Sequence, residues 1–160
     1  MALAWKNEDR AYPVAMQRRE HASILDPGLV AAYRRTRYRV HAHPPFTLRV
    51  DRPHARLAAL LAAQGGRGAA YVSACNPRGV EQDAATNAAR HARLLQDLQA
   101  RGAVWIDAFG AWPDRSGRGE RSVLVLDIGR HEALALGRRH EQNAVLWAGA
   151  DAVPRLLLLR

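Results

Sequence analysis

The stretch "AAYVSACNPRGVEQDAATNAARHARLLQDLQARGAVWIDAF", residues 69–109, decides the fold of this chain. It begins with a short apolar run, residues 69–74, that is typical of a buried strand. A turn with Asn76 and Pro77 follows, and apolar residues then recur at helical spacing over residues 83–101. A second apolar run comes after the helix. The stretch therefore predicts a strand–helix–strand unit, and such units favour a sheet covered by helices.

The helix in this stretch is expected to run from about Asp83 to Arg101 and to stop at Gly102. One stripe of its residues has the spacing of a face that packs on a sheet. The expected stripe consists of Ala84, Ala88, Ala92, Leu95 and Leu98.

The rest of the chain alternates in a similar way. Asp26 and Pro27 are typical of the start of a helix, and Asp51 is a candidate cap for a second one. The further expected helices are residues 26–36, 51–66 and 130–140, and the further expected strands are residues 38–42, 46–50, 122–128, 143–149 and 154–159. The first two of these strands could instead be one strand broken by a kink at Pro44 and Pro45. We therefore expect an α/β (α+β mixed) fold: a single mixed parallel/antiparallel sheet packed by about four helices.

The chain of 160 residues is long enough for one domain with a real core. Residues 1–22 are polar and lack a period, so we expect a poorly ordered N-terminal segment followed by a single globular domain over residues 23–160, with Met16 as an alternative start. The N-terminus lacks the apolar stretch of a signal peptide, no segment has the length and purity of a membrane span, and the single cysteine cannot form an internal disulfide. These features predict a cytoplasmic protein without a membrane partner.

The formal net charge is +9, and of the 24 basic residues only Lys6 is a lysine. One interpretation is a basic interaction module that binds nucleic acid or an acidic protein partner. The other is a composition bias toward Arg and Ala, as in a GC-rich genome. The arginines form small clusters at Arg34, Arg35, Arg37 and Arg39 and at Arg138 and Arg139. Under the first interpretation one face should gather Arg34, Arg35, Arg37, Arg138 and Arg139.

The turn at residues 74–79 is the best candidate ligand site. It joins the end of a strand to a helix, which is where ligands bind in open α/β sheets. A helix N-terminus favours an anion, Asn76 and Arg78 have side chains that can bind one, and Gly79 allows a close approach of the backbone. The alternative is structural: Asn76 bonds its own turn and Pro77 shapes the corner.

Other polar residues are expected near the same end of the sheet. Glu120 and Ser122 are two apart and share a face if a strand begins there, and Gln142 precedes a later strand. Glu120 is a candidate base, metal ligand or partner for Arg78, or simply a strand charge paired with an arginine. If the strand ends converge, one cleft is lined by Asn76, Arg78, Asn87, Glu120, Ser122 and Gln142.

Taken together, three segments resemble the bacterial domain-of-unknown-function family 3293. They are "SACNPRG" (73–79) with Asn87 downstream, "GRGERSVLV" (117–125) and "LGRRHEQNAVLW" (136–147). The positions that carry the resemblance are Ala74, Asn76, Pro77, Asn87, Glu120, Ser122 and Gln142. The resemblance spans about residues 28–159 and implies kinship of fold, but no activity.

The leading expectation is a small anionic or nucleotide-like ligand at the 74–79 turn, and the alternatives are the basic module and a purely structural domain. Trp112, beside a Gly-rich loop at residues 110–121, is the candidate for stacking on a ligand. No metal site is expected, since His41 and His43 lack a third ligand with diagnostic spacing. His91, His131 and His140 are expected on helix surfaces. Catalytic residues, cofactor and oligomeric state stay open.

Overall fold

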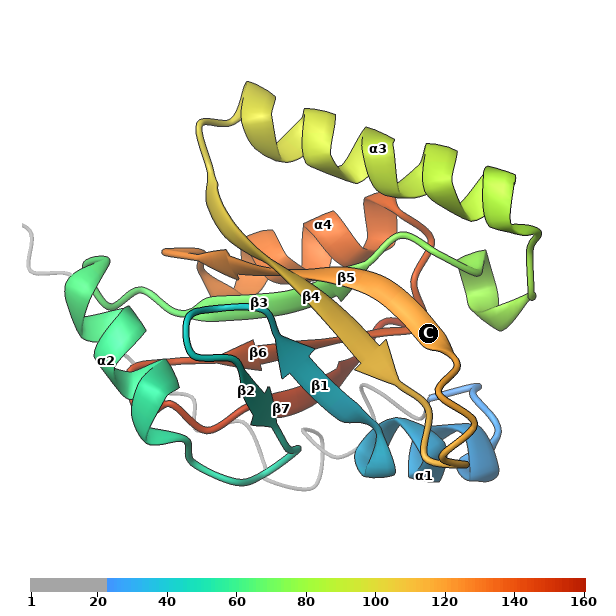
Figure 1. Cartoon of the computed structure of the whole chain (residues 1–160), viewed down its shortest axis with the longest axis horizontal. Coiled ribbons are helices and arrows are strands. Elements are labelled where there is room, and N and C mark those ends of the chain that lie inside the picture. The colour runs from blue at the N-terminus through green and yellow to red at the C-terminus, as the bar shows by residue number, and fades with distance from the viewer. Residues whose placement is uncertain (1–22) are drawn as a thin grey trace, which may run out of the picture.

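The computed structural model describes residues 23–160, so the expectation for residues 1–22 lies outside the described part of the chain. Four α-helices, one short 3-10 helix and seven strands occur in this part (Figure 1). The helices are α1 (Pro27–Arg35), α2 (Ala55–Ala63), the 3-10 helix η1 (Pro77–Gly79), α3 (Ala84–Ala100) and α4 (Arg130–Arg139). The strands are β1 (Arg37–Val40), β2 (Phe46–Leu48), β3 (Ala69–Ser73), β4 (Val104–Ala111), β5 (Gly119–Leu126), β6 (Ala144–Ala148) and β7 (Arg155–Leu158). No helix among these residues is long and apolar enough to cross a bilayer.

The seven strands form one sheet in the order β2-β1-β4-β5-β3-β6-β7, and every neighbouring pair is antiparallel. The expectation of parallel pairs is therefore wrong, while the expectation of one sheet with four helices is confirmed. The physical reason is the position of β5. Helix α3 connects β3 to β4, which run in the same direction, but β5 lies between them and pairs antiparallel with both. In the same way β3 separates β5 from β6, the two strands joined by α4.

Helices cover both faces of the curled sheet (Figure 1). On one face, Leu94 and Leu98 of α3 and Leu136 of α4 pack in one buried cluster with the central strands. On the other face, Leu57 and Leu61 of α2 belong to a second buried cluster. Two apolar layers are thus buried, one on each side of the sheet, and this burial supplies the main stabilisation.

The start of α1 agrees with the sequence, because Asp26 accepts a hydrogen bond from the backbone N–H of Leu29 at 3.1 Å. The start of α2 differs. His54, not Asp51, caps the helix, and its Nδ1 accepts from the N–H of Arg56 at 3.2 Å. Asp51 has a left-handed backbone (φ 61°) and instead pairs with Arg34. A histidine rarely signals a helix start, which is why the sequence pointed to the aspartate.

Helix α3 begins directly after its cap Asp83, close to the expected start, but the face that it presents to the sheet agrees with the expected stripe only at Leu98 and, in part, at Leu95. Its buried residues are His91, Leu94 and Leu98, whereas Ala84, Ala88 and Ala92 are exposed. Alanine is small and occurs on either side of a helix, so a stripe that rests mainly on alanines indicates the helix but not its rotation.

The antiparallel order brings several strand ends to one edge of the sheet. The C-terminal ends of β3 and β4 lie beside the N-terminal ends of β1, β5 and β6, as the register pairs Ser73 with Ser122 and Arg37 with Ala111. The polar residues noted in the sequence follow or precede these strand ends. This edge is where the candidate site forms.

Candidate functional site

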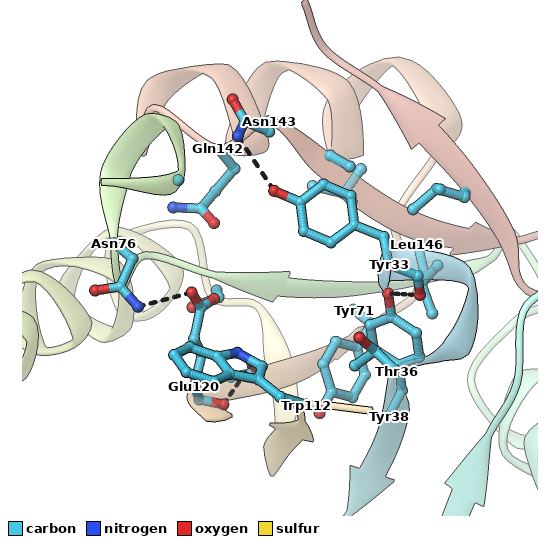
Figure 2. Close-up of a pocket in the computed structure, with 17 residues that line it drawn as sticks. Tyr33, Thr36, Tyr38, Tyr71, Asn76, Trp112, Glu120, Gln142, Asn143 and Leu146 are labelled. Carbon is cyan, nitrogen blue, oxygen red and sulfur yellow. Dashed lines mark hydrogen bonds between the residues drawn. The ribbon is translucent and has the colours of Figure 1, made fainter. Parts of the chain in front are cut away.

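A cavity of about 100 Å³ lies at this edge, where α1 meets the sheet (Figure 2). It mixes aromatic and polar side chains from segments far apart in the sequence. The polar and aromatic side chains that line it belong to Tyr33, Thr36, Tyr38, Tyr71, Ser73, Asn76, Trp112, Glu120, Ser122, Gln142 and Asn143. Four of the six residues expected from the sequence therefore share one cavity; they are Asn76, Glu120, Ser122 and Gln142.

Asn76 connects the turn after β3 to the start of β5. Its backbone is left-handed (φ 47°, ψ 61°), a conformation that asparagine tolerates better than most residues. Its Nδ2 donates to Oε1 of Glu120 at 2.9 Å (Figure 2). Its Oδ1 accepts from the backbone N–H of Gln82 and from Nδ2 of Asn87, both at 2.9 Å. The side chain of Asn76 thus has both of its polar ends occupied and a single orientation.

Glu120 is half-buried, and burial raises the pKa of its carboxyl group. Hydrogen bonds from Asn76 and Ser73 act in the opposite direction but are the smaller effects. No arginine or lysine lines the cavity. The carboxyl group is therefore held in a partly apolar site by a neutral amide, without a cation from the lining residues to balance it.

Gln142 and Asn143 complete the side of the cavity that lies before β6. The Nε2 of Gln142 donates to the carbonyls of Cys75 and His140, both at 3.1 Å, and Figure 2 shows its side-chain oxygen directed toward the cavity. The Nδ2 of Asn143 donates to the hydroxyl of Tyr33 at 3.1 Å. Because the hydroxyl accepts this bond, the hydrogen of Tyr33 is free to donate to a ligand. Gly79 makes room for Asn143, since a Cβ at Gly79 would lie 2.9 Å from its Nδ2.

Arg78 and Asn87 do not line the cavity. The exposed Arg78 side chain pairs with Glu141 at 3.4 Å rather than with Glu120. Asn87 lies behind the turn, where its Oδ1 accepts from the N–H of Asn76 at 2.9 Å.

The N–H groups of the turn are also occupied within the chain. Those of Cys75, Arg78 and Gly79 donate to Ser73, Glu141 and Asn76 respectively. The helix that follows the turn at once is the 3-10 helix, three residues long. The turn consequently offers no row of free N–H groups of the kind that binds an anion at a helix N-terminus.

The comparisons with known proteins concern the same region of the chain. Residues 72–145 match the family model DUF3293, a protein of unknown function. This match confirms the resemblance over those residues, which include Asn76, Asn87, Glu120, Ser122 and Gln142. No curated protein matches the chain, and no solved structure does.

Several lining residues lie outside the DUF3293 segment or carried no signal in the sequence. Tyr33, on α1, and Tyr38, on β1, precede the segment, and Tyr71, on β3, is the residue directly before it. The rings of Tyr38 and Tyr71 pack edge to face with centroids 5.1 Å apart, and the hydroxyl of Tyr38 donates to the carbonyl of Tyr33 at 2.7 Å. Burial raises the pKa of both phenols, so they stay neutral. The one sequence signal for Tyr38 is that it lies two positions before Val40, because alternate residues of a strand share a face and both of these are buried.

Trp112 and Ser122 differ in what they present to the cavity. Trp112 is half-buried, and the guanidinium of Arg118 lies over its ring at 4.9 Å from the centroid. One side of the indole is thus occupied by a cation, while the residue also lines the cavity. The buried Ser122 donates its hydroxyl hydrogen to the carbonyl of Glu120 at 3.1 Å, which leaves only its oxygen as an acceptor.

Other chemical candidates from the sequence lie elsewhere. Cys75 is buried, and burial raises the pKa of its thiol, which disfavours the nucleophilic thiolate. Of the three histidines expected on helix surfaces, His131 is exposed on α4, but the expectation for His91 and His140 is wrong, because both are buried. His140 contacts Asp97 at 2.9 Å. Within residues 23–160, no three side chains of the metal-binding types come together.

Proposed function

We propose that the cavity around Glu120 binds a small polar ring that carries N–H donors, such as the base of a nucleotide-like ligand. The single observation that carries this proposal is Glu120 itself. It is a half-buried carboxylate held by Asn76 at 2.9 Å, in a cavity whose lining contains no basic side chain. An isolated carboxylate in such a site gains most from a ligand that donates hydrogen bonds or bears positive charge.

The arrangement of donors and acceptors supports the same kind of ligand. A carboxylate can accept two parallel hydrogen bonds from two adjacent N–H groups, and the edge of an amidine-like ring carries such a pair of N–H groups. Oε1 of Gln142 adds an acceptor, and the hydroxyl of Tyr33 adds a donor. Of the two ligand classes expected from the sequence, anionic and nucleotide-like, the charge of the cavity favours the second.

The size of the cavity limits what can enter it. With a volume of about 100 Å³, it has room for roughly three water molecules or one small ring. Trp112 and the tyrosines supply flat apolar surface for such a ring. The sugar and phosphate of a nucleotide-like ligand would stay outside. The Trp112 loop is then a candidate lid.

Three expectations stay predictions beside this proposal. In the purely structural alternative, the Asn76–Glu120 hydrogen bond only fastens the turn to β5. The basic-module alternative concerns the arginine surface and not this cavity. The cytoplasmic location is likewise a prediction from the sequence. We assign no catalytic residue.

The test is a thermal-shift screen followed by calorimetry, with free nucleobases, nucleosides, small amidines and phosphorylated metabolites as probes. Glu120→Gln keeps the shape and an oxygen acceptor but removes the charge. We expect it to weaken binding of a ring ligand by roughly 10- to 100-fold, the range of a charge-assisted hydrogen bond. Glu81→Gln is the matched control, because Glu81 is exposed and outside the cavity.

Binding to the wild type should also strengthen with rising pH. The folded pKa of Glu120 is raised above its ordinary value, so the accepting carboxylate forms only as the pH passes that raised value. The proposal fails if no probe binds, or if folded Glu120→Gln binds as tightly as the wild type. In that case the pair of Asn76 and Glu120 is structural.

A further inference from the structure

A second hollow, of about 570 Å³, lies where α1 ends, beside the turn after β2 and the loop between β4 and β5. Most of its lining side chains are arginines, and we refer to it as the arginine hollow. The arginines are Arg34, Arg35, Arg37, Arg49, Arg52 and Arg115. A concentration of guanidinium groups around one concavity is an electrostatic feature that scattered surface arginines do not produce.

The arginine hollow is made by three segments that are distant in the sequence. They are residues 34–37, residues 49–52 and residues 113–115. In Figure 1 the loop between β4 and β5 lies beside α1, which explains how the third segment reaches the first. The fold therefore gathers arginines that look dispersed along the chain. Arg138 and Arg139, the other expected cluster, lie on α4 and do not line the hollow.

Few carboxylates balance this charge. Arg34 pairs with Asp51 at 2.8 Å, and the other five arginines of the hollow form no ion pair within the part of the chain that the structure describes. Arginines elsewhere do form ion pairs: Arg67 pairs with Asp127 and Glu132, and Arg139 pairs with Asp97. The hollow thus carries a net positive charge that the neighbouring side chains leave largely unneutralised.

The fold explains some of these arginines but not all. Arg34 and Arg35 lie in the last turn of α1, where cations interact favourably with the helix dipole. The Nη1 of Arg49 donates to the carbonyl of Arg35 at 3.1 Å. Arg37, Arg52 and Arg115 are exposed, and across residues 23–160 their side chains make neither a hydrogen bond nor an ion pair. Their guanidinium groups are available to a partner.

We propose that the arginine hollow binds consecutive phosphate groups of a nucleic acid strand. A guanidinium presents paired N–H donors that match two phosphate oxygens, and several such groups can bind several phosphates at once. One free phosphate needs only one or two of them. A nucleic acid strand carries one phosphate per nucleotide, so neighbouring nucleotides can supply a phosphate to each of several guanidinium groups.

The experiment measures binding of a fluorescent 20-residue single-stranded oligonucleotide by anisotropy at two salt concentrations. The test variant is Arg37→Gln with Arg115→Gln. The matched control is Arg130→Gln with Arg138→Gln, which removes the same charge from exposed positions on α4. We expect the test variant to bind at least about tenfold more weakly at low salt. The slope of the logarithm of the binding constant against the logarithm of the salt concentration should become shallower by about 0.7 for each phosphate contact removed. The control should bind nearly as the wild type does.

Three outcomes would overturn the proposal. They are an absence of oligonucleotide binding, an equal loss in the two double variants, and tighter binding of polyglutamate or anionic vesicles than of the oligonucleotide. The second would mean that only total charge matters, and the third would indicate an acidic protein or a membrane surface. Arg37 and Arg115 do not line the ring-binding cavity, so their double variant should bind a free nucleobase as the wild type does. Failure of the arginine hollow and failure of the ring-binding cavity are therefore distinguishable.

Discussion

Asn76 shows how much one residue contributes to this edge of the sheet. Its left-handed backbone makes the turn, and its side chain contacts β5, the loop before α3 and α3 itself through Glu120, Gln82 and Asn87. Three segments are therefore held by one amide. The residue type is needed twice, once for the backbone conformation and once for the donor and acceptor of the side chain.

Asn76→Ala should lower the free energy of unfolding by about 3 kcal/mol, because it strains the left-handed backbone and leaves buried polar groups unpaired. Asn76→Gly relieves the strain but not the lost hydrogen bonds, so it should be about 1–2 kcal/mol less destabilising. Urea denaturation of the two variants measures both effects. Equal stabilities for Ala and Gly would show that the backbone of Asn76 is not strained.

At the scale of the element, α3 is the part where the sequence misled most specifically. The helix and its cap at Asp83 follow from local signals, but its inward face is formed by His91, Leu94 and Leu98. The rotation places Leu94, which is 0% exposed, where the sequence pointed to Leu95. Bulky side chains decide the rotation, since alanines contribute little buried area on either face.

Leu94→Ala and Leu95→Ala test this rotation directly. Leu94 is fully buried on the side of α3 that faces the sheet, so its truncation should lower the free energy of unfolding by about 2–5 kcal/mol. Leu95 is only half-buried, and its truncation should cost roughly half as much or less. Both values come from denaturant titrations at one temperature. A larger loss for Leu95→Ala would favour the face expected from the sequence.

At the scale of the whole molecule, the sheet order determines which residues meet. Strands β3 and β4 lie on the two sides of β5, and this insertion makes the sheet antiparallel throughout. It also brings the start of β5, with Glu120, beside the turn that follows β3. The outer strands are β2 and β7, and β7 contains the apolar sequence "RLLL" with one free edge within the described chain.

Hydrogen exchange should follow this order. Amides of β5, which pairs on both sides, should exchange most slowly and approach the global unfolding limit. Amides of the outer strands β2 and β7 should exchange faster. Mass spectrometry of peptides from each strand measures the difference. Protection of β7 equal to that of β5 would indicate that a strand from another copy of the chain covers its edge.

Much of the local structure could be predicted from the sequence alone. Apolar runs marked the strands, Asp26 and Asp83 marked two helix starts, and the glycines and prolines marked the turns, because these signals act over a few residues. The sequence also singled out Asn76, Glu120, Ser122 and Gln142 as polar residues near strand ends, and the match over residues 72–145 includes them.

Tertiary structure alone decided the direction of the strands, the rotation of α3, and which residues line the cavity around Glu120 and the arginine hollow. A helix between two strands implies that they run in the same direction, but not that they are neighbours, since β5 can pair between them only after the chain has folded back. For the same reason Tyr33 and Tyr71 meet Glu120, and Arg37 meets Arg115, across long separations in sequence. Local preferences determine the elements, whereas burial of their apolar faces against one another determines which side chains share a site.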